Sequence, residues 1–195
     1  MRSTLLILAV LLVGCDGNTS TTKTAGGGNA GNKKVEPDTR PAFVLDPSKP
    51  FVIEFGRGSG WHGLDIVKID QTGTVQLSRV EGRPSAESAS LKLSSADVAT
   101  LVGLVNSNQL TSMGRTYSDP RIADGTQWVL WLEQSPSLKA IYFNNSFPSQ
   151  INAFAGGLDA LLQKVGLSAA KWSALPAQQA DAQQKTLWAR IEPAR

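Results

Sequence analysis

The apolar residues between positions 51 and 165 recur with two different spacings, and this pattern most constrains the fold. Residues 51–55, 64–69, 74–80 and 88–93 largely alternate apolar and polar side chains, which is typical of half-buried strands. In the first segment, Phe51, Ile53 and Phe55 share one face. Residues 70–73 (Asp-Gln-Thr-Gly) form a turn pattern between the second and third segments. These short connections predict an antiparallel β-meander.

Two helices are predicted in the same region. Ser94 followed by Asp97 is a capping-box pattern, and the apolar residues after it have helical spacing. A second helix is expected to begin after Pro148 and to stop at Gly166. Its apolar stripe consists of Ile151, Phe154, Leu158, Leu161, Leu162 and Val165. The pair Gly156-Gly157 within it costs roughly 1 kcal/mol per glycine relative to alanine, which a close backbone contact would explain.

Residues 126–133 and 138–144 predict a β-hairpin around Ser-Pro-Ser at 135–137. The order is therefore β-meander, helix, β-hairpin, helix, which predicts an α+β domain over residues 50–166 with the helices on one face of the sheet. Trp128 and Trp131 lie three apart on a strand and hence on opposite faces. We expect one of them in the core and the other covered by the C-terminal tail.

Residues 167–195 form this tail. It is rich in glutamine and alanine, and Leu187, Trp188 and Ile191 are spaced to lie on one side of a helix. Two interpretations stay open at this point: the helix packs back on the domain, or it binds a partner.

The charge of the chain is unevenly distributed. The formal net charge is +3 and the isoelectric point is about 9.1. Residues 50–165, however, carry nine Lys or Arg and ten Asp or Glu, so the excess lies outside the domain. A nucleic-acid partner is therefore not expected, because such proteins concentrate positive charge on the folded domain.

The N-terminus carries a targeting pattern that ends at Cys15, the only cysteine. Arg2 precedes an apolar run over residues 5–13, and residues 12–15 read Leu-Val-Gly-Cys. This run resembles the lipobox of bacterial lipoproteins. The resemblance implies a signal peptide over residues 1–14, lipidation of Cys15, and a location at the cell membrane or outer membrane, with the domain facing the periplasm or the cell exterior.

Two alternatives to the lipobox fit the N-terminus less well. A transmembrane anchor needs roughly 20 apolar residues, and residues 5–13 supply about nine. An ordinary secretory signal needs no cysteine at this position. Residues 15–49 are rich in Gly, Asn, Ser, Thr and Lys, which predicts a flexible tether on the order of 30 Å long.

Residues 57–63 read Arg-Gly-Ser-Gly-Trp-His-Gly after the first strand. This segment resembles the Gly-Gly-aromatic-Ala-Gly turn of emfourin-type proteins, small inhibitors of thermolysin-like metallopeptidases. The Ser94 helix, residues 124–128 and Pro148 follow in similar order, so the resemblance covers residues 51–165. Ser59 and His62 depart from the turn pattern. The resemblance implies the α+β layout and inhibition of an extracytoplasmic peptidase, but it assigns no inhibitory residue, because the matched positions are turn and packing residues.

Several kinds of site are not expected. His62 is the sole histidine and Cys15 is reserved for lipid, so the usual zinc ligands are lacking and no metal is predicted. Residues 56–60 are glycine-rich but lack the Gly-Lys-Ser/Thr ending of a phosphate-binding loop, and their spacing is not that of a dinucleotide fingerprint. We therefore predict no cofactor.

The candidate binding residues lie on two predicted loops. They are Arg57, Trp61 and His62 on the first, and Arg115, Tyr117, Asp119, Arg121 and Asp124 on the second. Arginine and aromatic side chains are enriched in binding hot spots, so converging loops would form an interaction surface. The sequence thus favours a non-catalytic binding module that contacts an envelope protein. The alternative is an envelope hydrolase that uses Asp119 and Asp124 as an acid/base pair.

Overall fold

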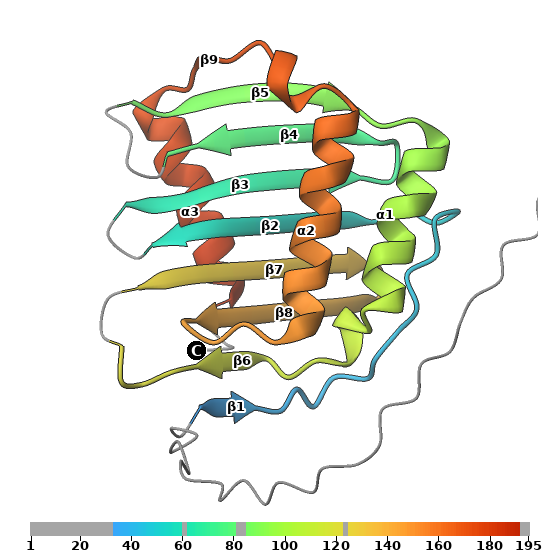
Figure 1. Ribbon diagram of the computed structural model, residues 1–195, viewed down its shortest axis with the longest axis vertical. Helices are drawn as coiled ribbons and strands as arrows, with labels where there is room; N and C mark the ends of the chain where they lie inside the picture. The colour runs from blue at the N-terminus through green and yellow to red at the C-terminus, as the bar shows by residue number, and fades with distance from the viewer. Residues whose placement is uncertain (1–32, 60–61, 81–84, 123–124, 192–195) are drawn as a thin grey trace, which may run out of the picture. The chain divides into compact units, whose positions relative to one another are not determined.

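A computed structural model of the chain describes residues 33–59, 62–80, 85–122 and 125–191. The folded unit is built on one sheet whose nine described strands have the order β1-β6-β8-β7-β2-β3-β4-β5-β9 (Figure 1). The strands are β1 (Lys34–Glu36), β2 (Val52–Ser59), β3 (Gly63–Asp70), β4 (Thr74–Arg79), β5 (Glu87–Lys92), β6 (Thr116–Ser118), β7 (Thr126–Gln134), β8 (Ser137–Asn144) and β9 (Ser173–Ala174). β6 runs parallel to β8 and all other pairs are antiparallel, so the sheet is mixed.

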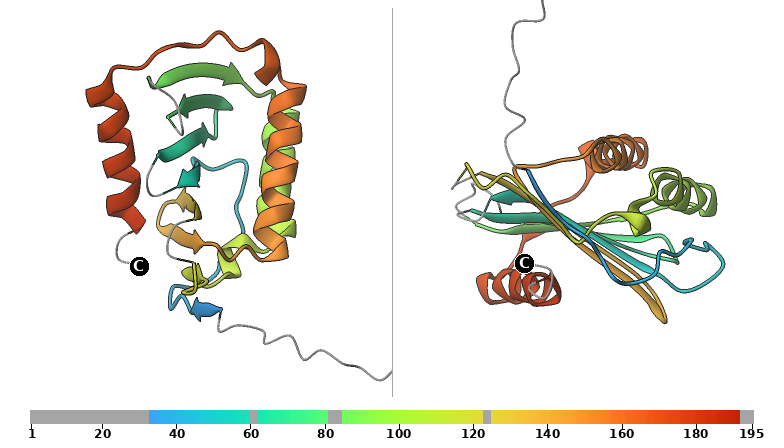
Figure 2. Two further views of the ribbon diagram at one scale, coloured as in Figure 1. Left: turned by 60° about the vertical axis from the view of Figure 1, so that its left-hand side comes forward. Right: turned by 90° about the horizontal axis from the view of Figure 1, so that it is seen from below.

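The helices are α1 (Ser95–Ser107), α2 (Ser149–Lys164) and α3 (Ala177–Ile191), with short 3-10 turns η1 (Leu110–Ser112) and η2 (Leu167–Ala169). α1 and α2 cover one face of the sheet, and α3 covers the opposite face (Figure 2). The α+β class is confirmed. α1 and α2, which correspond to the two helices predicted for residues 50–166, lie on one face, and α3 of the C-terminal tail lies on the other (Figure 2). The sheet is apolar on both faces in its centre, so the second face also needs a cover.

Two apolar cores result. The larger one lies under α1 and α2 and includes Phe55, Leu130, Ile141, Phe143, Phe154 and Leu158. The smaller one lies under α3 and consists of Leu64, Ile66, Val129, Trp131, Ala140, Tyr142, Leu187 and Ile191. Trp128 packs edge-on against Phe55 with ring centroids 5.6 Å apart, whereas Trp131 is buried in the smaller core. The prediction that the two tryptophans serve opposite faces is confirmed.

The local signals for the helices on the first face are also confirmed. The Ser94 side chain accepts a hydrogen bond from the backbone N–H of Asp97, whose carboxylate accepts one from the backbone N–H of Ser94. In α2, a Cβ at Gly157 would lie 2.6 Å from Leu104 Cδ2 of α1, whereas a Cβ at Gly156 would meet nothing within 4 Å. A close helix contact therefore explains one glycine of the pair.

The predicted flexible tether over residues 15–49 is wrong from Lys34 onward. β1 pairs with β6, and Leu45 is 1% exposed in the larger core. The backbone of Leu45 exchanges two 2.9 Å hydrogen bonds with the Asn106 amide. The segment is thus ordered by polar contacts to the rest of the fold, which its low apolar content does not reveal. Residues 15–32 lie outside the described part of the chain.

The tail after residue 166 belongs to the same folded unit. β9 pairs with β5 at the sheet edge, and Leu187 and Ile191 of α3 are 1% and 0% exposed. The Gln184 amide accepts a hydrogen bond from the Leu64 backbone N–H and donates one to the Leu64 carbonyl. The tail therefore packs back on the domain, and the boundary predicted at residue 166 does not separate two bodies.

Candidate functional site

The chain leaves β2 and β6 at the same end of the sheet, so parts of the two predicted loops lie there. Ser59 at the end of β2 is in register with Thr126 at the start of β7, and β3 begins and β6 ends on the same side (Figure 1). His62 is exposed, and its backbone N–H donates to Ser59 Oγ at 3.2 Å. Two other candidate residues on these loops, Trp61 and Asp124, lie outside the described residues.

Asp119 is a paired carboxylate at this end of the sheet. It is 4% exposed, and its two oxygens accept hydrogen bonds from Nε and Nη2 of Arg121 at 2.8 and 2.6 Å. The Arg121 guanidinium lowers the pKa of Asp119 to about 2. At neutral pH this carboxylate is ionised and already occupied, which suits a structural or binding role better than proton transfer near neutrality.

Arg115 and Tyr117 lie away from that loop end. Arg115 immediately precedes β6 and pairs with Glu36 of β1, with Nη2 3.1 Å from Oε2. Tyr117 stacks on Phe143 with centroids 5.4 Å apart, and its hydroxyl accepts a 2.8 Å hydrogen bond from the Gly114 N–H. The structure therefore does not gather all the predicted residues into one surface.

Arg57 lies on strand β2 instead of on a loop. Its guanidinium donates to both carboxylate oxygens of Asp159 in α2, at 2.8 and 2.6 Å, and packs over the Phe55 ring at 5.3 Å. Arg57 follows Phe51, Ile53 and Phe55 with the period of a strand, so it lies on the face that α2 covers. It forms an ion pair between sheet and helix.

This ion pair borders a cavity of about 500 Å³ between α2, the first half of β3 and the end of β4. Its polar and aromatic lining includes Arg57, Asp65, Arg79, Asp159 and Trp172, and its apolar lining includes Val67, Leu77, Leu162 and Leu167. We call this space the α2 cavity. It places positive, negative, aromatic and aliphatic groups within reach of one small ligand or of a few side chains.

In the same lining, the guanidinium of Arg79 lies 3.3 Å from the centre of the Trp172 ring. Arg79 also donates from Nη2 to Glu87 at 2.9 Å, while its Nε is buried with no hydrogen-bond partner in the described part of the chain. A cation over the face of an indole is attracted by the ring. This stack gives the α2 cavity a preformed wall.

Sequence reasoning missed Asp159, Arg79 and Trp172. One signal was present: Arg79 follows Val75 and Leu77 with the period of a strand, and is therefore a charged residue at an inward-facing position. Trp172 comes to the cavity only through the path of the chain after α2, for which the sequence holds no comparable signal.

The described residues contain no group of three or more His, Cys, Asp or Glu side chains placed to hold a metal ion. A search of the same residues for a helix long and apolar enough to span a bilayer also finds none. Cys15, the predicted lipidation site, is outside the described ranges.

Comparison with known proteins assigns no family to this chain. No protein-family model matches this chain, and no curated protein matches it significantly.

Proposed function

We propose that this chain is an envelope lipoprotein, anchored through Cys15, whose folded unit is a non-catalytic binding module. The lipobox pattern supports the anchor. The α2 cavity carries the binding part of the proposal, because its Arg79–Trp172 stack and its Arg57–Asp159 pair expose the side-chain types that dominate binding hot spots.

The α2 cavity suits a short segment of an envelope protein. Its volume of about 500 Å³ is in the range of small-ligand pockets, so it accommodates a few side chains of a partner. Its apolar lining, including Leu162 and Leu167, favours an aliphatic or aromatic side chain. The flanking charges of both signs favour a peptide with polar groups on either side of that anchor.

Crosslinking in intact cells, followed by mass spectrometry of what copurifies, tests this proposal. We expect Trp172→Ala and Arg79→Gln to reduce the yield of a crosslinked envelope protein about tenfold, as loss of a hot-spot side chain does. His62→Ala and Arg121→Gln at the loop end are the matched comparison and should leave the yield unchanged. If only the two loop variants reduce the yield, the binding site lies on the loops instead. Unchanged yields in all four variants reject both surfaces.

Inhibition of an extracytoplasmic metallopeptidase is a special case of this function. The resemblance of residues 57–63 to the emfourin-type turn favours it. The test is a titration of a purified thermolysin-like peptidase with the chain, read out by cleavage of a peptide substrate. Stoichiometric loss of cleavage supports inhibition. Unchanged cleavage at a large excess of the chain rejects inhibition of that peptidase class while leaving the binding module in place.

The alternative of an envelope hydrolase uses Asp119 and Asp124. The pairing of Asp119 with Arg121, which lowers the pKa of Asp119 to about 2, argues against a general acid at neutral pH. Asp119→Asn and Asp124→Asn together should leave the cellular function intact. Loss of function in this double variant, with the melting temperature unchanged, would favour the hydrolase.

The anchor has an independent test. Cys15→Ser should move the protein from the membrane fraction to the soluble fraction of lysed cells. Membrane association that persists in the variant contradicts lipidation at Cys15, whatever the result for the α2 cavity.

A further inference from the structure

Three carboxylates of the folded unit are each shared by one lysine and one arginine. The groups are Lys34 and Arg115 at Glu36, Lys139 and Arg40 at Asp38, and Lys68 and Arg190 at Glu54, with N···O distances between 2.7 and 3.1 Å. Each group of three carries one positive charge in excess.

The arginines of the three groups meet at one cavity of about 530 Å³ near the end of α3. Its lining includes Glu36, Asp38, Arg40, Arg115, Ala140 and Arg190, and we call it the charged cleft. Arg190 also borders an adjoining cavity of about 270 Å³ that contains Glu54 and Lys68. The charged cleft is thus formed by segments far apart in the sequence: the chain around β1, the start of β6, strand β8 and α3.

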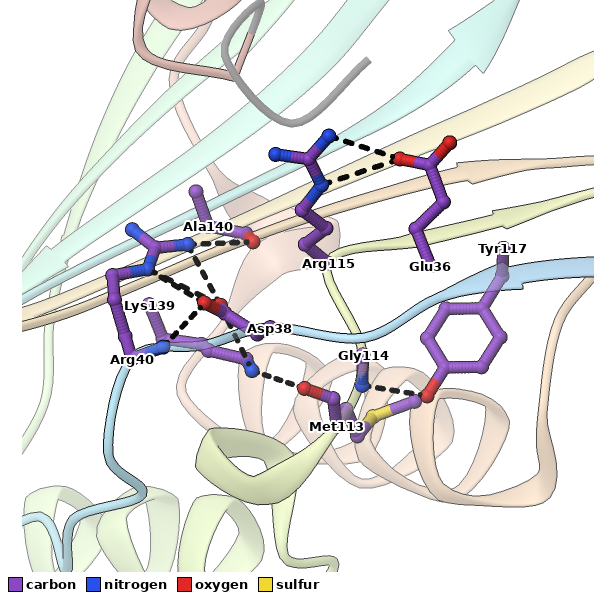
Figure 3. Close-up of polar contacts among 9 residues, drawn as sticks. All are labelled: Glu36, Asp38, Arg40, Met113, Gly114, Arg115, Tyr117, Lys139 and Ala140. Carbon is purple, nitrogen blue, oxygen red and sulfur yellow. Dashed lines mark hydrogen bonds and ion pairs between the residues drawn. The ribbon is translucent and has the colours of Figure 1, made fainter.

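Each guanidinium is held in place either by two hydrogen bonds to its carboxylate or by a contact with another group. Arg40 donates from Nε and Nη2 to the two oxygens of Asp38, at 2.9 and 2.8 Å, and its Nη2 is 3.4 Å from the Ala140 carbonyl (Figure 3). Arg115 donates to Glu36 from both Nε and Nη2. The guanidinium of Arg190 lies 5.1 Å from the Trp131 ring centre. Such contacts lower the entropy cost of presenting the charges to a ligand.

The pair under the charged cleft is buried. Lys139 is 2% exposed, bonds to the Met113 carbonyl, and lies 3.1 Å from Asp38 (Figure 3). Burial alone would raise the pKa of Asp38, but hydrogen bonds from Arg40 and Lys139 outweigh it and hold that pKa well below its ordinary value. Asp38 is therefore a fixed anion that orients cations on two sides.

We propose that the charged cleft binds a phosphate group. A guanidinium carries five N–H donors. Arg40 donates from Nε and Nη2 to Asp38 and from Nη2 to the Ala140 carbonyl, and Arg190 donates from Nη1 to Glu54, so these two arginines retain N–H groups for a second acceptor. The guanidinium groups of Arg40 and Arg190 come from different elements and line the same cavity, so they match the several oxygens of a tetrahedral phosphate better than the two coplanar oxygens of a carboxylate. The positive excess of the three groups favours an anion over a neutral ligand.

Phosphate reaches this site from either of two sources. One is a free phosphate or phosphate ester. The other is a phospholipid headgroup, since the segment that supplies Glu36, Asp38 and Arg40 follows residues 15–32, which connect it to the proposed lipid at Cys15. The proposal itself does not rest on the function proposed for the α2 cavity, which lies on the other face of the sheet.

Isothermal titration calorimetry at low ionic strength tests the proposal. The chain carries Cys15→Ser, so that no acyl chain is attached, and is titrated with sodium phosphate and with dihexanoyl phosphatidylglycerol below its micelle concentration. We expect saturable binding that Arg40→Gln and Arg190→Gln each weaken about tenfold, the loss expected for one charge-assisted hydrogen bond. Arg57→Gln in the α2 cavity is the matched control and should leave the affinity unchanged.

The possible results distinguish the two sources of phosphate. Saturable phosphate binding without lipid binding assigns a free phosphate or phosphate ester, and lipid binding at least as tight assigns the headgroup. Because Arg190→Gln removes a contact of α3, melting temperatures are measured for all variants. If Arg190→Gln lowers the melting temperature, the affinity of Arg40→Gln, which leaves that helix contact intact, is the deciding result. The proposal is overturned if neither probe binds at millimolar concentration, or if Arg40→Gln binds like the parent chain.

Discussion

The two faces of the sheet are covered in different ways. Under α1 and α2, large apolar side chains such as Phe55, Phe154 and Leu158 form a continuous core, with ion pairs such as Arg57–Asp159 near its margin. Under α3 the core is small, and next to it Glu54 is buried at 6% exposure with Lys68 and Arg190 as its partners. One sheet is thus closed on one side by apolar area and on the other by a few apolar anchors combined with charge.

This difference bears on how much each side contributes to stability. An apolar stripe stabilises the fold through area removed from water, about 25 cal/mol per Å², and needs no exact partner. Buried ion pairs contribute little net stability, because desolvation offsets their attraction. The ion pairs beside the smaller core are therefore expected to add less net stability than the apolar area under α1 and α2.

The largest effect is expected from the charged side. In Asp38→Ala, the ammonium of Lys139 loses its anion while it stays 2% exposed, and breaking such a buried pair costs about 3–5 kcal/mol. Urea unfolding measures the loss. Asp46→Ala is the control, because the Asp46 side chain is 39% exposed and its removal should cost far less.

A double variant sharpens this result. Asp38→Ala combined with Lys139→Met removes both charges and should recover most of the lost stability, since an apolar side chain tolerates that site. If Asp38→Ala has the same free energy of unfolding in urea as the parent chain, the buried Lys139 does not need Asp38 for stability. The difference described between the two faces of the sheet is then contradicted for the charged face.

The next effect compares one leucine on each face. Leu158 of α2 and Leu187 of α3 are 0% and 1% exposed, and replacing a buried leucine by alanine costs about 2–5 kcal/mol. We expect Leu158→Ala to lower the global stability by this amount. Leu187→Ala should act mainly on α3, whose amides should exchange hydrogen faster while the rest of the chain keeps its protection, because few buried side chains hold that helix.

Hydrogen exchange read out by mass spectrometry distinguishes the two variants. Uniformly faster exchange in both would mean that α3 and the main core unfold together. The smaller core would then be an integral part of one cooperative unit.

The sequence predicted the first face well and the second poorly, for physical reasons. The Ser94–Asp97 cap and the stripe of α2 depend on near neighbours, so spacing alone reveals them. The pairing of Asp38 with Lys139 and that of Glu54 with Arg190 join residues far apart in the sequence, and no local pattern marks them. Strands of three residues such as β1 and β6 are too short to show a period.

The residues of the candidate site were also predicted only in part. Arg57 was identified by its residue type and its place near a turn, although it lies on a strand and pairs with Asp159. Asp119 was identified as a loop carboxylate, but its pairing with Arg121 was not foreseen. Trp172 could not be assigned to the α2 cavity without the path of the chain after α2.

A smaller effect is expected from Gly56 on β2, which lies beneath α3. A Cβ at this position would lie 2.7 Å from Val129 Cγ2 and 3.1 Å from Leu187 Cδ2, so Gly56→Ala should push α3 away from the sheet. Overpacking of this kind costs about 1–3 kcal/mol. The change should appear as a lower melting temperature together with faster hydrogen exchange in α3. Unchanged exchange there would show that the smaller core has room to adjust.

The smallest effects separate the two glycines of α2. Gly156 is exposed and a Cβ there meets nothing within 4 Å, so Gly156→Ala should stabilise the chain by about 0.5–1 kcal/mol through helix propensity. At Gly157 the same methyl would lie 2.6 Å from Leu104 Cδ2. Leu104 is only half-buried and can shift, so we expect the propensity gain to be cancelled rather than reversed. Equal stabilisation by both variants, measured by urea unfolding, would mean that α1 and α2 are less closely packed than Gly157 indicates.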